Sequence, residues 1–433
     1  MDILTQLSKQ AEQVEVVSLQ NEQTMVEYEA NQLKTCTVTE TRGMAVRVIR
    51  KGRLGFAASS DGQALDKLAV NVLESAAYGD QASFSFPEAQ PAPAVRTFDQ
   101  AVADLPIARL AEIGREILDL VLPVEPNARC NITVERSLVS ASIRNHTGLD
   151  ISFRNSPLAL GLEIDRIEGD DVLILYDQLG TTLWEENYLE FAGRLVEKLK
   201  QARRITSIKP GKMPVLFAPA GALALVFPLS QGLNGRAVLK GISPLKGKTG
   251  EKLFDEKISL FDDGTIDGMF ASSTYDDEGM PRRCNALIEK GVLKSFIYDL
   301  KTAAQAGVES TGNAARGLFN PPASSFTNRI IQPGETALKD ILAGIDEGIL
   351  VEDLIGLGQG NTISGAFSNP LALAFKIEQG EIVGRVKGLS IAGNVYDLLK
   401  EVTAVSRESQ WVFSTFQAPY ILIPEMNVAG KSR

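Results

Sequence analysis

The stretch GMAVRVIRKGRLGFAASSDG, residues 43–62, decides the fold, because apolar and polar side chains alternate on both sides of a Lys-Gly pair. Alternation with a period of two residues is typical of β-strands, and Gly favours the tight turn between antiparallel neighbours. Similar alternation begins near residue 15, so residues 15–60 predict successive antiparallel strands with turns at Gly43 and at Lys51–Gly52. The expected strands are Thr24–Glu29, Thr35–Thr41, Ala45–Arg50 and Leu54–Ser59.

Amphipathic segments, with apolar residues at helical spacing, flank these strands in the first half of the chain. They predict helices over residues 2–14, 62–78, 104–122 and about 181–204. The Pro/Ala-rich residues 85–97 predict an extended linker or a segment that wraps an edge. Further strands are expected at Cys130–Ser142, Asp150–Leu160 and Leu162–Ile167.

The second half changes character after the Lys/Gly/Pro-rich segment Ile205–Pro214. Short β-patterned runs separated by glycines dominate it, and few helices intervene. We therefore predict an α+β protein, with an N-terminal α/β domain (residues 1–205) in which helices flank an antiparallel sheet, and a β-rich C-terminal domain (residues 206–433). The expected C-terminal strands are Ile258–Phe261, Ala286–Ile288, Val292–Tyr298, Leu371–Glu378, Glu381–Val386 and Tyr420–Ile423, and the expected helices are 222–231, 336–346 and 394–402.

The composition argues against several classes of protein. The 433 residues include 54 acidic and 44 basic side chains, and a net charge of −10 repels nucleic-acid phosphates. Cys36, Cys130 and Cys284 are far apart and form no CxxC pair, so we expect neither a disulfide framework nor a cysteine-rich zinc site, and a cytoplasmic location. The apolar runs are too short to cross a bilayer, and the first residues lack the apolar core of a signal peptide.

The single histidine limits the chemistry further. A zinc peptidase usually takes two or three His ligands, and a Ser-His-Asp hydrolase would depend on His146 alone. His146 lies in the polar run IRNHTGLD, where we expect a turn residue bonded to the backbone. The run GLSIAGN contains Gly388 and Gly393 and predicts a strand-to-helix turn with Asn394 as the helix N-cap. No phosphate-binding Gly-rich motif occurs, so nucleotide binding has no support.

Several segments, taken in chain order, carry a similarity to a known family. They are residues 43–62, YDDEGMPRRCNALIEKGVLKSFIYD (275–299), TGNAAR (311–316), SGAFS (364–368), KIEQGEIVGRVKGLSIAGN (376–394) and PYILIPEMNVAG (419–430). This ordered set resembles the TldD/PmbA family, whose founding members mature a small peptide toxin and were also described as modulators of DNA gyrase. Each segment is weakly specific alone, but together they span nearly the whole chain.

The resemblance also locates a metal site that this chain lacks. Active members of the family are similar in carrying HExxxH on a C-terminal helix and a later cysteine, which would hold zinc, with the glutamate as general base. The matching helix is VFPLSQ (226–231), where Val226 and Gln231 replace the histidines and Phe227 replaces the glutamate. No cysteine follows Val402, and Pro228 would kink the helix or confine it to short pieces. This chain is therefore expected to hold no zinc, and the apolar helix is expected to pack in the core or to serve as a docking surface.

Two polar runs are the candidate substrate contacts. Asp276, Asp277 and Glu278 could bind a cation or a substrate amine, or could instead form a solvated turn paired with nearby arginines. The resemblance implies that this run shapes the floor of a groove. In TGNAAR, Thr311, Asn313 and Arg316 could hold a peptide carboxylate, or could form a structural turn that Asn313 caps before a helix.

The resemblance implies a function shared between two subunits. A chain of this metal-free, PmbA-like branch would pair with a TldD-like subunit that carries the zinc, or with itself, and would supply a cleft wall and contacts to an unfolded peptide. It would have no cofactor or catalytic residue of its own. Two alternatives stay open: a hydrolase with a non-zinc mechanism, and a binding protein that acts on DNA gyrase.

Overall fold

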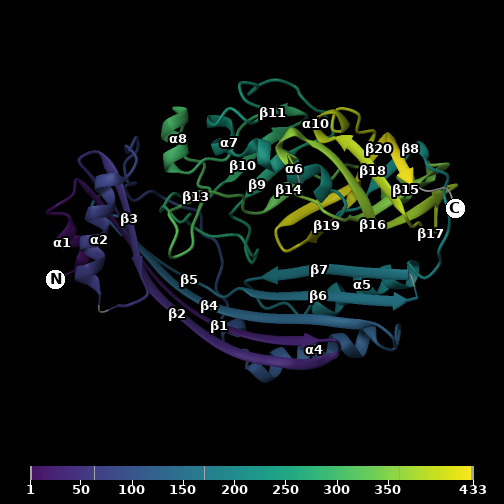
Figure 1. Ribbon diagram of the computed structural model, residues 1–433, viewed down its shortest axis with the longest axis horizontal. Helices are drawn as coiled ribbons and strands as arrows, with labels where there is room; N and C mark the ends of the chain where they lie inside the picture. The colour runs from purple at the N-terminus through teal and green to yellow at the C-terminus, as the bar shows by residue number, and fades with distance from the viewer. Residues whose placement is uncertain (1, 63, 170, 360, 431–433) are drawn as a thin grey trace.

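A long antiparallel sheet built by the first half of the chain curves beneath the second half (Figure 1). The computed structural model describes residues 2–62, 64–169, 171–359 and 361–430. The sheet has seven strands in the order β3-β2-β1-β4-β6-β7, and β5 pairs with β4. They are β1 Gln13–Glu29, β2 Gln32–Arg50, β3 Arg53–Ser59, β4 Arg129–Asn145, β5 Asp150–Asn155, β6 Leu158–Glu168 and β7 Asp171–Thr181.

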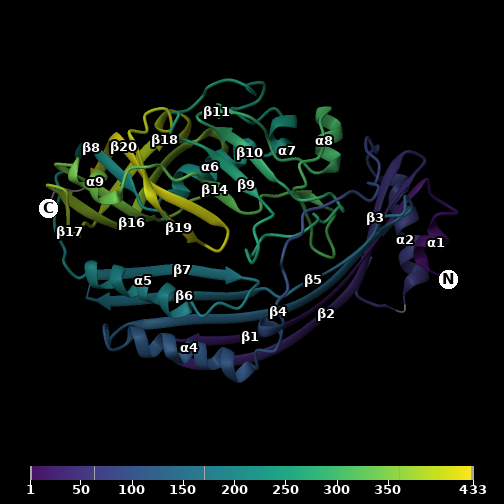
Figure 2. The same ribbon diagram turned by 180° about the vertical axis from the view of Figure 1, so that it is seen from behind.

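Helices cover two separate parts of this first sheet. Near one end, α1 (Ile3–Leu7) and α2 (Leu65–Tyr78) bury apolar residues against β1 and β2. Farther along, α4 (Ile107–Val121) packs against β1 and β4 and contacts α5 (Tyr188–Gln201). The short helix α3 (Gln100–Ala103) precedes α4. Figure 2 shows α4 on the side of the sheet that faces away from the second half.

The second half forms a mixed sheet of eleven strands. Its strands are β8 Gly211–Phe217, β9 Leu260–Asp263, β10 Cys284–Glu289, β11 Val292–Leu293, β14 Arg329–Ile331, β15 Glu347–Leu354, β16 Ala366–Glu378, β17 Glu381–Arg385, β18 Leu389–Asn394, β19 Ala404–Val412 and β20 Phe416–Gly430. A separate pair joins β12 Ala314–Ala315 to β13 Ala323–Ser324. The helices are α6 Leu223–Leu233, α7 Gly235–Leu239, α8 Leu300–Ala306, α9 Leu338–Ala343, α10 Val395–Leu398 and the 3-10 turn η1 Thr362–Ser364.

One of the buried hydrophobic clusters contains residues from both halves. Phe191 and Leu199 of α5 belong to the same buried cluster as Leu350 of β15 and Phe375 of β16. Burying large apolar side chains is the main stabilising contribution to a core, so the halves stabilise each other. The predicted α+β class, with a first antiparallel sheet and a β-rich second half, is confirmed. The division at residue 205 stays a prediction.

Several local predictions are confirmed. Lys51 and Gly52 form the turn between β2 and β3, both with positive φ, as a tight hairpin requires. Asn394 caps α10 by accepting a hydrogen bond from the Tyr396 N–H. Residues 85–97 form neither helix nor strand and reach the second half, where Arg96 pairs with Asp267. Among the residues that the structure describes, no helix has the length and apolar character needed to span a membrane.

Other local predictions are wrong. The first helix ends at Leu7, and β1 begins at Gln13. Gly43 is no turn: β2 runs through it, and a Cβ there would lie 2.3 Å from a Leu318 side-chain carbon. The turn signal at this glycine reflects a close tertiary contact instead.

The remaining errors concern the extents of elements. Residues 181–187 are not helical, because β7 ends at Thr181 and α5 begins at Tyr188. The strand expected over 292–298 is only two residues long. Residues 314–315 form β12 where a helix start was expected, so Asn313 caps no helix. Pro228 does not end α6, which continues to Leu233 because its apolar residues are anchored in the core.

Candidate functional site

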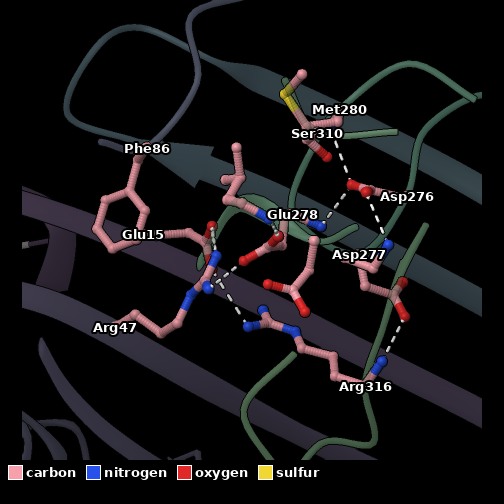
Figure 3. Close-up of polar contacts among 12 residues, drawn as sticks. Glu15, Arg47, Phe86, Asp276, Asp277, Glu278, Met280, Ser310 and Arg316 are labelled. Atoms are coloured by element: carbon pink, nitrogen blue, oxygen red, sulfur yellow. Dashed lines mark hydrogen bonds and ion pairs between the residues drawn. The ribbon is translucent and has the colours of Figure 1, made fainter. Parts of the chain in front are cut away.

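The acidic run of residues 276–278 forms a tight loop that lies against the first sheet (Figure 3). Asp276 is fully buried, and its carboxylate accepts hydrogen bonds from the backbone N–H groups of Glu278, Met280 and Ala314, each at 2.9 Å. Gly279 has a φ of +80°, which favours glycine. The Asp276 side chain therefore determines the loop conformation from inside.

Glu278 connects this loop to the first sheet. One oxygen lies 2.6 Å from Arg47 Nη1, and the other accepts from the Leu300 N–H at the start of α8. Arg47 also forms a bidentate pair with Glu15, and Arg316 Nη1 lies 3.2 Å from a Glu15 oxygen. All four side chains are at most 4% exposed. We call these four residues the balanced cluster, because two carboxylates face two guanidinium groups.

Burial dominates the electrostatics of this region. It raises the pKa of Glu278 to about 7, against the opposing effect of Arg47, and it raises the pKa of Asp276 to about 6. Burial also lowers the pKa of Arg316, although Glu15 opposes this. For Arg47, burial alone would lower the pKa, but Glu15 and Glu278 outweigh it and the net shift is upward. Such perturbed groups are typical of functional sites and of buried ion-pair networks.

The TGNAAR run lies directly beside the acidic loop. Its Arg316 N–H donates to Asp277, while the Asn313 side chain donates to Asp262 at 2.6 Å and accepts from Thr311. Asn313 is fully buried and Thr311 is 9% exposed. All six predicted contact residues thus come together in one place. Their role in substrate binding stays a prediction, and the hydrogen bonds described here hold the two loops together.

The arginines next to the acidic run have different partners from those expected. Arg282 donates to the carbonyl oxygens of Gly312 and Ala314, and Arg283 donates to that of Ser310. They tie the two loops to each other and form no ion pair with the acidic run. A cavity of about 620 Å³ opens here, lined by Phe84, Met280, Arg283, Leu300, Val308 and Glu309 among others.

Sequence reasoning missed Glu15, Arg47 and the aromatic residue above them. Phe86 lies 5.0 Å from the Arg47 guanidinium carbon, measured to the ring centroid. Glu15 and Arg47 stand as single charges within the apolar runs VEVV and AVRVI. A charge inside an apolar strand pattern is a usable signal, because a buried charge needs a partner.

Two family models match this chain. The model described as the PmbA/TldA metallopeptidase C-terminal domain matches residues 210–430, and the model of domain 1 matches residues 14–76. The chain belongs to the PmbA/TldD family. The second-half match contains both polar runs, and the first-half match contains Glu15 and Arg47.

Some relatives and solved structures are similar to this chain along most of their lengths. A metalloprotease of Methanothermobacter thermautotrophicus is 28% identical, over 84% of this chain and 82% of its own. The crystal structure of TldE from Thermococcus kodakarensis is 27% identical, covers 99% of both chains and superposes with a TM-score of 0.90. A candidate DNA gyrase modulator from Thermotoga maritima shares the fold, at 24% identity, 99% and 98% coverage and a TM-score of 0.89.

The residues on α6 do not fit the zinc ion that the PmbA/TldD name implies. Val226 is 2% exposed and packs in the core, Phe227 is partly buried, and only Gln231 faces solvent. Valine and phenylalanine have no donor atom for a metal, and an amide is a poor zinc ligand. Within residues 2–62, 64–169, 171–359 and 361–430, no group of three or more His, Cys, Asp or Glu side chains could hold a metal ion.

His146 lies beside Phe86, with the two ring centroids 6.4 Å apart. Its side chain is exposed, and its backbone N–H donates to the Val14 carbonyl oxygen, as expected of a turn residue. The partial burial of its ring lowers its pKa.

Proposed function

We propose that this chain is a non-catalytic, metal-free subunit of a TldD/TldE-type metallopeptidase that degrades or matures unfolded peptides. The observation that carries the proposal is the chemistry of α6, where Val226, Phe227 and Gln231 stand at the positions of two ligands and a base. Nothing at these positions can activate a water molecule. The peptide bond would be cleaved on a zinc-bearing, TldD-like partner.

The site supports a positioning role for this chain. Asp276, Glu278 and Asn313 are saturated by internal hydrogen bonds, so they would act by holding the loops in place. Direct contact with a peptide would then fall to the exposed Arg283 and Val308 and to the other residues that line the adjacent cavity. The mixture of apolar and charged lining suits an unfolded peptide without a strict sequence requirement.

The first experiment measures bound zinc and peptidase activity for this chain, for a TldD-like protein that carries HExxxH, and for their mixture. We expect no stoichiometric zinc and no cleavage from this chain alone. The mixture should co-elute in gel filtration and cleave unfolded peptides. A partner whose motif glutamate is replaced by Gln should still co-elute but be inactive. Cleavage by this chain alone, or a mixture that neither co-elutes nor gains activity, would overturn the proposal.

The cavity offers a second test within the same mixture. Arg283→Ala should raise the KM for an unfolded peptide and leave co-elution intact. Lys294→Ala is the matched control, because Lys294 is an exposed cation that pairs with Glu289 on a neighbouring strand. An equal effect of both variants would argue against the cavity as the substrate contact.

A further inference from the structure

A second charge cluster joins the halves at the opposite end of the first sheet. There the hairpin between β6 and β7 lies beneath β17 (Figure 1). Asp171, the first residue of β7, accepts hydrogen bonds from Arg166 at 2.8 Å and from Arg385, and lies 2.6 Å from Lys387 Nζ. Arg385 and Lys387 belong to the second half, so this cluster also spans the two halves.

This cluster has more positive than negative charge. Three cations share the single carboxylate of Asp171, which leaves two positive charges without a counter-ion among the described residues. Glu168 lies opposite Asp171 in the β6–β7 register, but it is exposed and forms no ion pair with the three cations. We call Arg166, Asp171, Arg385 and Lys387 the cationic cluster.

The two arginines are almost fully buried despite this imbalance. The Arg166 and Arg385 side chains are each 3% exposed. Each donates to Asp171 through Nη2, while Nε of each is buried without an acceptor and Nη1 of each makes no hydrogen bond to a described residue. Buried charge without a partner is costly, so the unmatched donors of these guanidinium groups favour the binding of a counter-ion.

We propose that the cationic cluster binds a small dianionic oxyanion of the phosphate class. The two positive charges that lack a counter-ion among the described residues match a dianion. Guanidinium groups with free N–H donors suit the geometry of phosphate oxygens, and the Lys387 ammonium has donors to spare. Lys387 is 41% exposed and Asp171 is 12% exposed, so an anion can approach from the side of Lys387.

Bound phosphate would hold the halves together, because its ligands come from both. Arg166 lies on β6, whereas Arg385 ends β17 and its backbone bonds to the connection between the halves at Arg204 and Thr206. This inference does not depend on the proposed peptidase role, because the site shares no residue with α6 or with the acidic loop.

The test is calorimetric titration of the full chain with inorganic phosphate near pH 8, where phosphate is mostly dianionic, with thermal melting in parallel. Phosphate should bind and raise the Tm, and chloride at equal ionic strength should not. Lys387→Gln should weaken phosphate binding about tenfold, as expected for the loss of one charge-assisted hydrogen bond, and Lys387→Arg should restore it. Lys212→Gln is the matched control, since Lys212 pairs with Glu425 elsewhere on the surface.

Two further arms separate the sources of the anion and the structural alternative. A small phosphate monoester that binds more tightly than inorganic phosphate would identify a metabolite as the ligand, and the reverse order would favour the free ion. Asp171→Asn removes the one carboxylate, so added phosphate should restore its lost Tm. The proposal is overturned if phosphate does not bind, if chloride gives the same rise in Tm, or if Asp171→Asn shows no recovery in phosphate.

Discussion

The two charge clusters that join the halves of this molecule differ in how their charges balance. In the balanced cluster, Glu15 and Glu278 face Arg47 and Arg316 in a fully buried setting. In the cationic cluster, Asp171 is the one carboxylate of the described residues that pairs with the three cations, at a partly open edge. A closed, neutral network can stabilise one arrangement of two domains without help, whereas an open network with excess charge depends on what the solvent supplies.

The largest effect is expected where the closed network loses one partner. Arg47→Ala leaves the buried carboxylate of Glu278 without its cation and leaves Glu15 with Arg316 alone, so the free energy of unfolding should fall by about 3–5 kcal/mol. Urea unfolding followed by tryptophan fluorescence measures this. Arg42→Ala is the matched control on the same strand, because Arg42 and its partner Glu40 are exposed.

The result is informative even if Arg47→Ala does not fold. Arg47→Lys keeps the charge but loses the bidentate pair with Glu15, so it should lie between wild type and Arg47→Ala. Equal stability of Arg47→Ala and Arg42→Ala would contradict the distinction between the closed network and the surface.

A smaller loss is expected in the cationic cluster. Asp171→Asn should cost about 2–3 kcal/mol in chloride buffer, because hydrogen bonds between ionised groups are lost at a site that water partly reaches. The pKa of Asp171 is lowered to about 2: burial would raise it, but Lys387 and Arg385 outweigh burial, so the carboxylate is ionised at neutral pH. Urea unfolding with and without phosphate checks this. A loss larger than that of Arg47→Ala would reverse the ranking of the two clusters.

The fold class and the positions of most elements could be predicted from the sequence, because they depend on the local pattern of residues. The β2–β3 hairpin follows from alternation and the Lys51–Gly52 pair, and α2 and α4 follow from amphipathic spacing. Gly43 was wrongly predicted to be a turn, because glycine is needed there for a tertiary contact. Leu318 of the second half occupies the space of its missing side chain. A contact of that kind has no signature in a single sequence.

The candidate site was predicted in part for the same reason. The six polar residues of 276–278 and 311–316 stand out locally, and the structure brings them together. Arg47 lies 231 residues from Glu278 in the chain, so no local pattern could connect them. The cationic cluster was missed altogether, because charged residues in a strand hairpin and in the connection after β17 are individually ordinary.

The pH dependence of the free energy of unfolding should also distinguish the two clusters. The folded-state pKa of Glu278 is raised from 4.5 to about 7, so the folded protein holds this proton more tightly than the unfolded chain does. Stability from this group is complete below about pH 4.5 and is lost as the pH rises towards 7. Asp276 contributes in the same direction. In Glu278→Gln, the urea midpoint should change less between pH 5 and 7 than it does in wild type. An equal change in both proteins would contradict this assignment.

The smallest effect is expected at a third contact between the halves, where one cation meets one carboxylate. Lys198 of α5 lies 2.7 Å from Glu352 of β15, with side chains 28% and 9% exposed. Lys198→Met removes the charge and keeps the aliphatic stem, so the free energy of unfolding should fall by about 1 kcal/mol or less. Urea unfolding at low and high salt checks this, because screening should erase the difference between variant and wild type. The loss of unfolding free energy in Lys198→Met could instead persist at high salt and be as large as that of Asp171→Asn. That result would show that a contact stabilises the protein because it lies between the halves, and that the balance of its charges matters little.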